Sequence, residues 1–153
     1  YRRARETPGA TAVLALDATI VTNKRELAAA DFFQGMFSTA LDDGEIVVAV
    51  RFNIPKRAAY EKFPHPASGY AMAGVFVAEG AAGLRVAVTG AASGVFRWAE
   101  AEAALAKKFD AAALEGAALD MSNMNEDIHA TREYRANLVK VMAKRAVQKL
   151  LES

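Results

Sequence analysis

The sequence predicts an α+β fold, in which an antiparallel sheet carries helices packed on one of its faces. The strand-like segments come first along the chain and the helix-like segments come last, an order typical of this class. Hydrophobic residues make up 53% of the 153 residues, enough to bury one compact core or a core with part of a second. A boundary near Pro55 is expected to separate the tail of one subdomain, residues 1–54, from a domain of a three-stranded sheet and a helical bundle, residues 55–153.

Short elements are expected before this boundary. Thr11–Leu16 is apolar and fits the end of a helix or a short strand. Ala18–Thr22 is β-branched and is expected to pair with Arg25–Leu27 as a hairpin. Ala28–Phe33 is helix-like, and a cluster of large side chains in and after it is expected to pack in the core: Phe32, Phe33, Met36 and Phe37.

A long strand is expected from Glu45 to Ile54, because its apolar residues alternate. One side of this strand would carry Ile46, Val48, Val50 and Phe52. Pro55 lacks the backbone N–H that a further ladder hydrogen bond needs, so it ends the strand.

The second part of the chain is expected to open with a loop over residues 56–69, with a short strand near Tyr60–Phe63. Extended segments joined by turns follow: Tyr70–Glu79, Leu84–Thr89 and Val95–Trp98. Helical segments complete the chain: Ala99–Lys108, Asp110–Leu119 and about Glu126–Leu151. Asp127 would then lie at the start of the last helix and complement its dipole.

Composition excludes several classes of function. There are 19 Lys and Arg against 18 Asp and Glu, a net charge of +1, which argues against nucleic acid as a partner. The chain has no cysteine, so it holds no disulfide and no thiolate-bound metal or iron–sulfur cluster. No apolar run reaches the length of a membrane span, and no signal peptide is visible. These features favour a cytoplasmic protein, and a start at Tyr1 rather than Met indicates a fragment or a trimmed chain.

The stretch Ala59–Tyr70 is the candidate site. It brings Lys62 together with aromatic residues, and prolines stiffen the path from Phe63 to Tyr70. A flat, electron-accepting ring needs an aromatic face to stack on and a positive charge near its polar edge. On spacing alone, an ordinary strand connection with a buried Phe is the favoured explanation of the stretch. The only histidines, His65 and His129, stand far apart without acids at catalytic spacing, so we predict no catalytic residue and no metal ligand.

Several segments together resemble the flavoprotein, or medium, subunit of molybdenum hydroxylases, of which aerobic carbon-monoxide dehydrogenase is the best-known member. The most similar segments are Glu45–Pro55, Tyr60–Phe63, Pro66–Ala71 and Asp127–Arg135. The likeness continues in Leu14–Ala18, Ala30–Phe37, Val88–Ala91 and Trp98–Leu105, so it spans almost the whole chain. Asp127, Tyr134 and Arg135 form a hallmark of this family that we interpret as structural.

This resemblance implies an FAD-carrying electron-transfer subunit of the carbon-monoxide dehydrogenase type. Electrons would pass from iron–sulfur clusters on a small [2Fe-2S] subunit through FAD to an external acceptor. Substrate would be oxidised on a large molybdopterin subunit, and the complex would be a dimer of heterotrimers. By the resemblance, Lys62 lies near the flavin ring, Tyr70 stacks on one of its faces, and Val47 touches the cofactor. Residues 1–54 would then be the end of an α/β FAD-binding subdomain.

One feature of the family is missing from this sequence. Two glycine-rich loops hold the FAD pyrophosphate in the family, and neither is present here; both would lie before Tyr1. Weak or no FAD binding is therefore expected from these residues alone. Two other roles stay open at this stage: a non-catalytic module that docks onto the other subunits, and a small α+β protein that binds an unrelated ligand.

Overall fold

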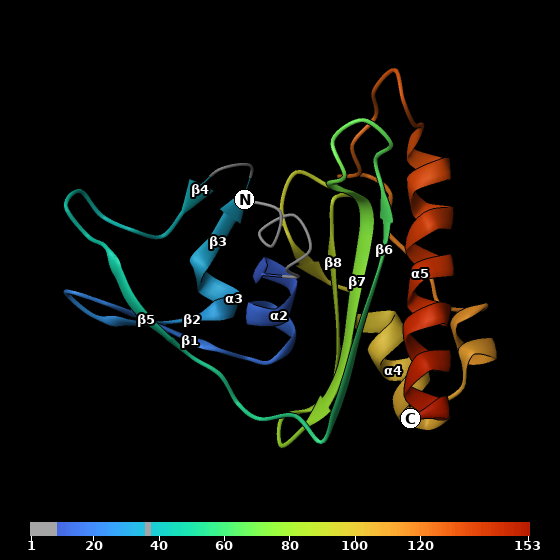
Figure 1. The fold of residues 1–153 in the computed structure, drawn as a ribbon, viewed down its shortest axis with the longest axis horizontal. Coiled ribbons are helices and arrows are strands. Elements are labelled where there is room, and N and C mark those ends of the chain that lie inside the picture. The colour runs from blue at the N-terminus through green and yellow to red at the C-terminus, as the bar shows by residue number, and fades with distance from the viewer. Residues whose placement is uncertain (1–8, 36–37) are drawn as a thin grey trace.

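The computed structural model describes residues 9–35 and 38–153, and it confirms the α+β fold (Figure 1). Its helices are α2 (Gly9–Ala15), α3 (Ala29–Phe32), α4 (Ala99–Lys107) and α5 (Arg132–Glu152), with a 3₁₀ turn at Ala111–Leu114. Its strands are β1 (Thr19–Thr22), β2 (Glu26–Ala28), β3 (Phe33–Gly35), β4 (Ser38–Thr39), β5 (Val47–Arg51), β6 (Arg57–Pro64), β7 (Ala71–Gly80), β8 (Gly83–Thr89) and β9 (Phe96–Arg97). Within the predicted aromatic cluster, Phe32 and Phe33 pack edge to face at 5.2 Å, and Met36 and Phe37 lie outside the described residues.

The central sheet has the strand order β6-β7-β8-β9, and all its neighbours are antiparallel. Strand β6 pairs with β7 from Arg57 opposite Glu79 to Phe63 opposite Ala73. Strand β7 pairs with β8 through a tight turn in which Gly83 has φ +86°, a conformation that favours glycine. The sheet is therefore four-stranded, and the prediction of three strands was short by β9.

The two faces of the central sheet are buried against different helices, because successive side chains of a strand point to opposite sides. One face packs under α4 and α5, and its buried strand residues include Val75, Val77, Val86 and Val88. The opposite face, with Phe76 and Ala87, packs against Leu14 of α2. Figure 1 shows α5 on one side of the sheet and α2 on the other. The prediction of helices on one face holds for α4 and α5, and α2 adds cover to the second face.

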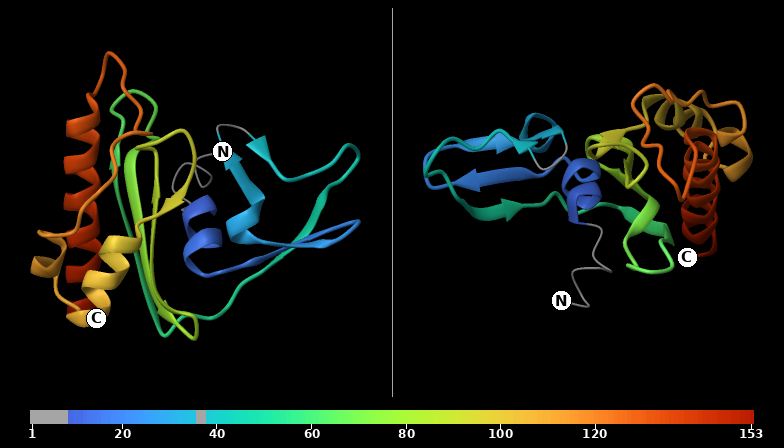
Figure 2. Two further views of the ribbon diagram at one scale, coloured as in Figure 1. Left: turned by 180° about the vertical axis from the view of Figure 1, so that it is seen from behind. Right: turned by 90° about the horizontal axis from the view of Figure 1, so that it is seen from above.

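A smaller sheet, with the order β2-β1-β5, lies beyond α2 and forms the far end of the molecule from α5 (Figure 2). The predicted hairpin is confirmed: Ile20 of β1 lies opposite Leu27 of β2. The strand predicted from Glu45 to Ile54 is shorter in the structure, where β5 covers only Val47–Arg51. Its apolar side chains stay exposed among the described residues, with Ile46 at 61% and Val48 at 56%.

A buried carboxylate fixes the turn that leads into β5. The side chain of Glu45 has no exposed surface and pairs with Arg25 at 2.9 Å. It also accepts hydrogen bonds from the Thr22 hydroxyl at 2.7 Å and the Asp42 backbone N–H at 2.8 Å. These three donors together lower the pKa of the Glu45 carboxyl to about 2, and the Arg25 guanidinium has the largest effect.

Three predicted elements differ from the structure. The loop expected over residues 56–69 is mostly strand β6, since every position from Arg57 to Phe63 has a partner in β7, and only residues 65–70 remain a loop. The helix expected over Asp110–Leu119 is reduced to the 3₁₀ turn. The last helix begins at Arg132 rather than near Glu126, because the Thr131 side chain caps it by accepting a hydrogen bond from the Tyr134 N–H.

The predicted role of Asp127 as a helix-dipole partner is wrong, because Asp127 lies before the cap of α5. Its carboxylate instead closes a turn by accepting hydrogen bonds from the backbone N–H groups of His129 at 2.9 Å and Ala130 at 3.0 Å. It also pairs with the guanidinium of Arg135 at 2.7 Å. The interpretation of Asp127 and Arg135 as structural therefore agrees with the structure.

Arg135 ties three parts of the chain together. One guanidinium nitrogen, Nη1, donates to the carbonyl oxygens of Met72 and Gly90, each at 3.2 Å, and Nη2 donates to Asp127. These acceptors belong to the start of β7, the end of β8 and the segment before α5. Only 5% of Arg135 is exposed. Gly90 has φ +79°, and a Cβ there would lie 2.2 Å from the Ala71 carbonyl oxygen, so a side chain would push these strand ends apart.

Replacing Arg135 with Met should destabilise the protein by about 3 kcal/mol, because the change removes a donor from the buried Met72 carbonyl and the partly buried Gly90 carbonyl and breaks the ion pair with Asp127. Chemical denaturation followed by far-UV circular dichroism measures this loss. The matched control is Arg132→Met, because Arg132 is half exposed and pairs with exposed Glu126 at 3.2 Å; it should change stability by about 0.5 kcal/mol or less. Equal effects of the two changes would contradict the structural role of Arg135.

The low pKa of Glu45 predicts that the folded protein loses stability in acid. Its pKa is about 2 in the folded chain and about 4.3 in an unfolded one, so its contribution is complete above pH 4.3 and is lost as the pH falls toward 2. Glu45→Gln should remove this part of the pH dependence, and urea denaturation of both proteins between pH 6 and pH 2.5 measures it. Parallel stability curves for the wild type and Glu45→Gln would refute the assignment.

Candidate functional site

Lys62 lies in the middle of β6, on the face of the central sheet that looks toward α2. Its neighbours in the strand establish this face. Phe63 packs with the core under α5, and Glu61 pairs with Lys149 of α5 at 2.9 Å. Tyr60 packs in the other cluster, with α2. Alternation then places Lys62 on the same face as Tyr60.

The surface beside Lys62 is built from Tyr60 and a glycine. Lys62 lies opposite Gly74 of β7. A Cβ on Gly74 would lie 2.5 Å from the Tyr60 hydroxyl oxygen, so the missing side chain is what lets the Tyr60 ring lie across β7. Burial raises the pKa of Tyr60, and the phenol therefore stays neutral at physiological pH.

Tyr70 closes the loop of residues 65–70, directly before β7. The loop is held by its own backbone: the His65 N–H donates to the Tyr70 carbonyl at 2.7 Å, and the Gly69 N–H donates to the His65 carbonyl at 2.8 Å. Gly69 has φ +72°, which suits a residue without a side chain. The Lys62 ammonium donates to the Gly69 carbonyl at 3.2 Å. The structure thus brings the Lys62 charge to the residue next to Tyr70, whose side chain is 54% exposed.

Val47 lies apart from these two residues. It belongs to β5 of the smaller sheet, where it pairs with Thr22, and it is 41% exposed. Figure 2 shows the smaller sheet separated from β6 and β7 by α2. The structure therefore groups Lys62 with the loop that carries Tyr70, and it places Val47 in a different part of the molecule.

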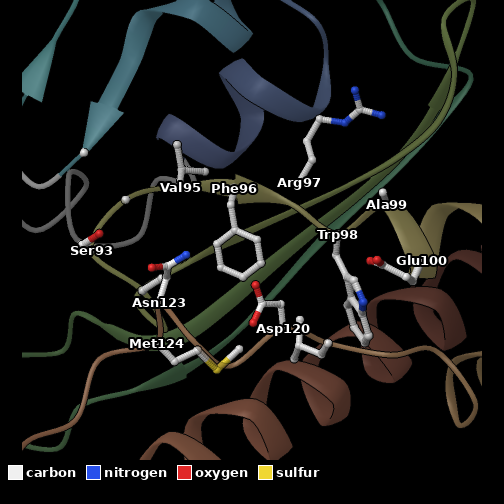
Figure 3. Close-up of a pocket in the computed structure, with 14 residues that line it drawn as sticks. Ser93, Val95, Phe96, Arg97, Trp98, Ala99, Glu100, Asp120, Asn123 and Met124 are labelled. Carbon is white, nitrogen blue, oxygen red and sulfur yellow. The ribbon is translucent and has the colours of Figure 1, made fainter.

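A separate cavity of about 490 Å³, which no sequence pattern predicted, lies beside β9 (Figure 3). Phe96 and Trp98 line it together with Asp120, Asn123 and Met124. Figure 3 shows Arg97 pointing away from these side chains, on the other side of β9. The two aromatic residues belong to a predicted brief extended segment, whereas Asp120, Asn123 and Met124 lie between two predicted helices, so no pattern indicated that they would meet.

Two polar side chains of this cavity, Asp120 and Trp98, are engaged in hydrogen bonds with neighbouring residues. The Asp120 carboxylate accepts hydrogen bonds from the N–H and hydroxyl of Ser122, and these lower its pKa. The Trp98 indole N–H donates to the Ala118 carbonyl at 2.6 Å. The cavity can accept a small ligand by shape, but its residues show no arrangement for catalysis. No group of three or more His, Asp or Glu side chains within residues 9–35 and 38–153 could hold a metal ion.

Comparison with known proteins identifies the class of fold and then the family. The structure of quinoline 2-oxidoreductase from Pseudomonas putida 86 matches with a TM-score of 0.72 over 91% of this chain, at 24% sequence identity. An identity this low shows a shared fold. The chain spans 53% of the length of the chain it matches. No curated protein sequence matches.

A family profile described as the CO dehydrogenase flavoprotein C-terminal domain matches residues 58–150, more than half of the chain. The chain therefore belongs to the family of CO dehydrogenase flavoprotein C-terminal domains, and the family resemblance drawn from the sequence is confirmed. The matched residues begin at the second position of β6 and end within the last turn of α5, so they include nearly all of the central sheet and of α5. Within the described part of the chain, no helix has the length and apolar character needed to cross a bilayer.

Proposed function

We propose that this chain is the C-terminal portion of the FAD-carrying electron-transfer subunit of a molybdenum hydroxylase, and that Lys62 and Tyr70 contact the flavin. The observation that carries the proposal is the hydrogen bond from the Lys62 ammonium to Gly69, the residue before Tyr70. It holds a positive charge against the backbone that leads into exposed Tyr70, on a loop anchored in a rigid sheet. A flat ring with a polar edge fits this pair, with Tyr70 against one face and Lys62 near the edge.

The bound flavin would supply the capacity to accept two electrons and release them to an acceptor. The role of this chain would be to position and tune it. The Lys62 ammonium would stabilise negative charge on the reduced ring and so favour reduction. The Tyr70 ring would exclude water from one face and limit the ring's movement. Val47 stays a predicted cofactor contact. Because Val47 lies in the smaller sheet, it would contact a different part of the cofactor from the part near Lys62.

The remaining assignments follow the family. The partners would be a small [2Fe-2S] subunit that delivers electrons and a large molybdopterin subunit that oxidises substrate, arranged as a dimer of heterotrimers. We propose the carbon-monoxide dehydrogenase type and a cytoplasmic location. The exposed apolar residues in and beside β5 support a larger subunit, since a patch of this kind calls for cover by protein: Ile46, Val48, Val50, Phe52 and Ile54.

A potentiometric titration of the intact flavoprotein subunit tests the role of Lys62. Lys62→Ala should lower the two-electron midpoint potential of the flavin by about 30 mV, which corresponds to about 1.4 kcal/mol, because the reduced ring loses its cation. Tyr70→Ala should instead weaken flavin retention about tenfold, through the loss of stacking and burial. Dialysis followed by flavin absorbance measures retention.

The matched control is Lys56→Ala, because Lys56 is 77% exposed at its side chain and lies 3.9 Å from Glu79, away from the loop of residues 65–70. It should leave both the potential and the retention unchanged. An unaltered flavin spectrum, potential and retention in both Lys62→Ala and Tyr70→Ala would remove these residues from the site. That outcome, combined with poor assembly of the complex, would favour the alternative role as a docking module.

A further inference from the structure

The cavity beside β9 has the size of a small-molecule site. Its volume of about 490 Å³ falls within the range of about 300–1,000 Å³ that is usual for such sites. Strand β9 is the edge strand of the central sheet at the opposite end from β6, which carries Lys62. A ligand in this cavity would therefore contact other residues than Lys62 and Tyr70, and the residues that line the cavity decide which class of ligand fits.

Apolar side chains from two separate segments form the walls. Phe96 comes from β9, and Leu119 and Met124 come from the segment between the 3₁₀ turn and α5. Trp98 is only 1% exposed, and its indole N–H is bound to the Ala118 carbonyl, so its ring is held in place. Figure 3 shows Phe96 and Trp98 extending from the same side of their strand. These walls favour a ligand with an apolar body that includes a flat ring.

The charge that faces the cavity is negative. Of the described residues that line it, Glu100, Arg97 and Asp120 carry a charge. Figure 3 shows the Arg97 side chain on the opposite side of β9 from Asp120. The Arg97 guanidinium is also paired, since its Nε donates to the Glu102 carboxylate at 2.9 Å. The two remaining carboxylates thus favour a cation over a neutral molecule or an anion.

The Asp120 carboxylate has room for a further hydrogen-bond donor. One of its oxygens accepts from the Ser122 N–H at 2.8 Å, and the other accepts from the Ser122 hydroxyl at 3.0 Å. A carboxylate has about four acceptor positions, so these bonds leave about two unused. Both bonds lower the pKa of Asp120, which is therefore charged at neutral pH. Figure 3 shows the carboxylate pointing toward the space beneath Phe96.

We propose that this cavity binds a small organic cation, in which an ammonium group is attached to an apolar body with an aromatic ring. The ammonium group would donate to Asp120, and exposed Glu100 would add attraction at the rim. The face of the Phe96 ring would attract the same charge. The apolar body would lie against Leu119 and Met124. A metal ion fits less well, because the described part of the chain has no group of three His, Asp or Glu side chains that could hold one.

Three probes with the same ring and different charges test the proposal: benzylammonium, benzyl alcohol and benzoate. Trp98 is the single tryptophan and lines the cavity, so its fluorescence in the full chain reports binding. At neutral pH and low salt, benzylammonium should bind about tenfold more tightly than benzyl alcohol, and benzoate should bind most weakly. Added salt should weaken the binding of benzylammonium and leave that of the alcohol unchanged. Equal affinities for the three probes, or no binding of benzylammonium, would overturn the proposal.

Asp120→Asn tests the carboxylate named in the proposal. The amide keeps the size of the side chain and an oxygen that can accept from Ser122, but it removes the charge. It should weaken the binding of benzylammonium about tenfold, to the level of benzyl alcohol, and leave the alcohol unchanged. An unchanged preference for benzylammonium would refute the role of Asp120.

The matched control is Asp110→Asn. Asp110 also accepts a hydrogen bond from the backbone N–H two residues further on, that of Ala112, at 2.9 Å. It is not among the described residues that line the cavity. The control should leave the affinities for all three probes unchanged, and a loss equal to that of Asp120→Asn would contradict the assignment.

Amide NMR of the wild-type chain locates the bound probe, and it decides the matter if a variant fails to fold. Benzylammonium should shift the amide signals of Asn123 and Met124, because both residues line the cavity. Shifts confined to residues outside the cavity would overturn the proposal. None of these measurements involves a flavin, so failure of the cation site leaves the proposed function untouched, and failure of the flavin experiments leaves the cation site untouched.

Discussion

The guanidinium of Arg135 is the interaction on which the arrangement of this domain depends. It is a buried cation that reaches the start of β7, the end of β8 and the carboxylate before α5. Without it, the Met72 and Gly90 carbonyls and one oxygen of the Asp127 carboxylate would lose a donor. The loop of residues 65–70 leads directly into β7, so the position of Tyr70 follows from the same tie. Asp127 and Arg135 thus stabilise the strand ends, and they influence the position of Tyr70 only indirectly.

The central sheet has two faces with different tasks. Valines cover one face under α4 and α5, and that face is closed. The other face packs only partly against α2 and carries Tyr60 and Lys62 toward the smaller sheet. The family profile begins within β6 and leaves β1, β2 and β5 outside it. The start of the match lies close to the proposed boundary near Pro55, and the proposed flavin site would lie on the face of the sheet that packs against α2.

The sequence predicted the elements whose patterns are local. The extended apolar segments of β7 and β8, the alanine-rich α4 and the hairpin of β1 with β2 were all predicted from local composition and turn residues. The prediction of a loop in place of β6 was wrong. Pro64 and Pro66 are typical of a loop, but the strand runs up to Pro64. The start of α5 was misplaced because Asp127 and Thr131 are both good helix-start residues, and only the fold shows which one caps.

The site was predictable only in part, for a physical reason. Lys62 and Tyr70 lie eight positions apart, so a strand and one short loop suffice to bring them together. The contact between His65 and His129, the cavity beside Phe96 and the hydrogen bonds of Arg135 join segments that are distant in sequence. No periodicity carries that information, since such contacts are decided by the packing of α5 and of residues 119–130 against the sheet.

The central claim is that a flavin ring lies on the α2 side of the central sheet, against Tyr70 and near Lys62. A crystal structure of the intact subunit with its flavin tests it most directly. We expect the Lys62 Nζ atom within about 3 Å of a polar atom of the ring, and the Tyr70 ring about 4 Å from one of its faces. A flavin that contacts neither side chain, or that lies on the α5 side of the sheet, would contradict the claim.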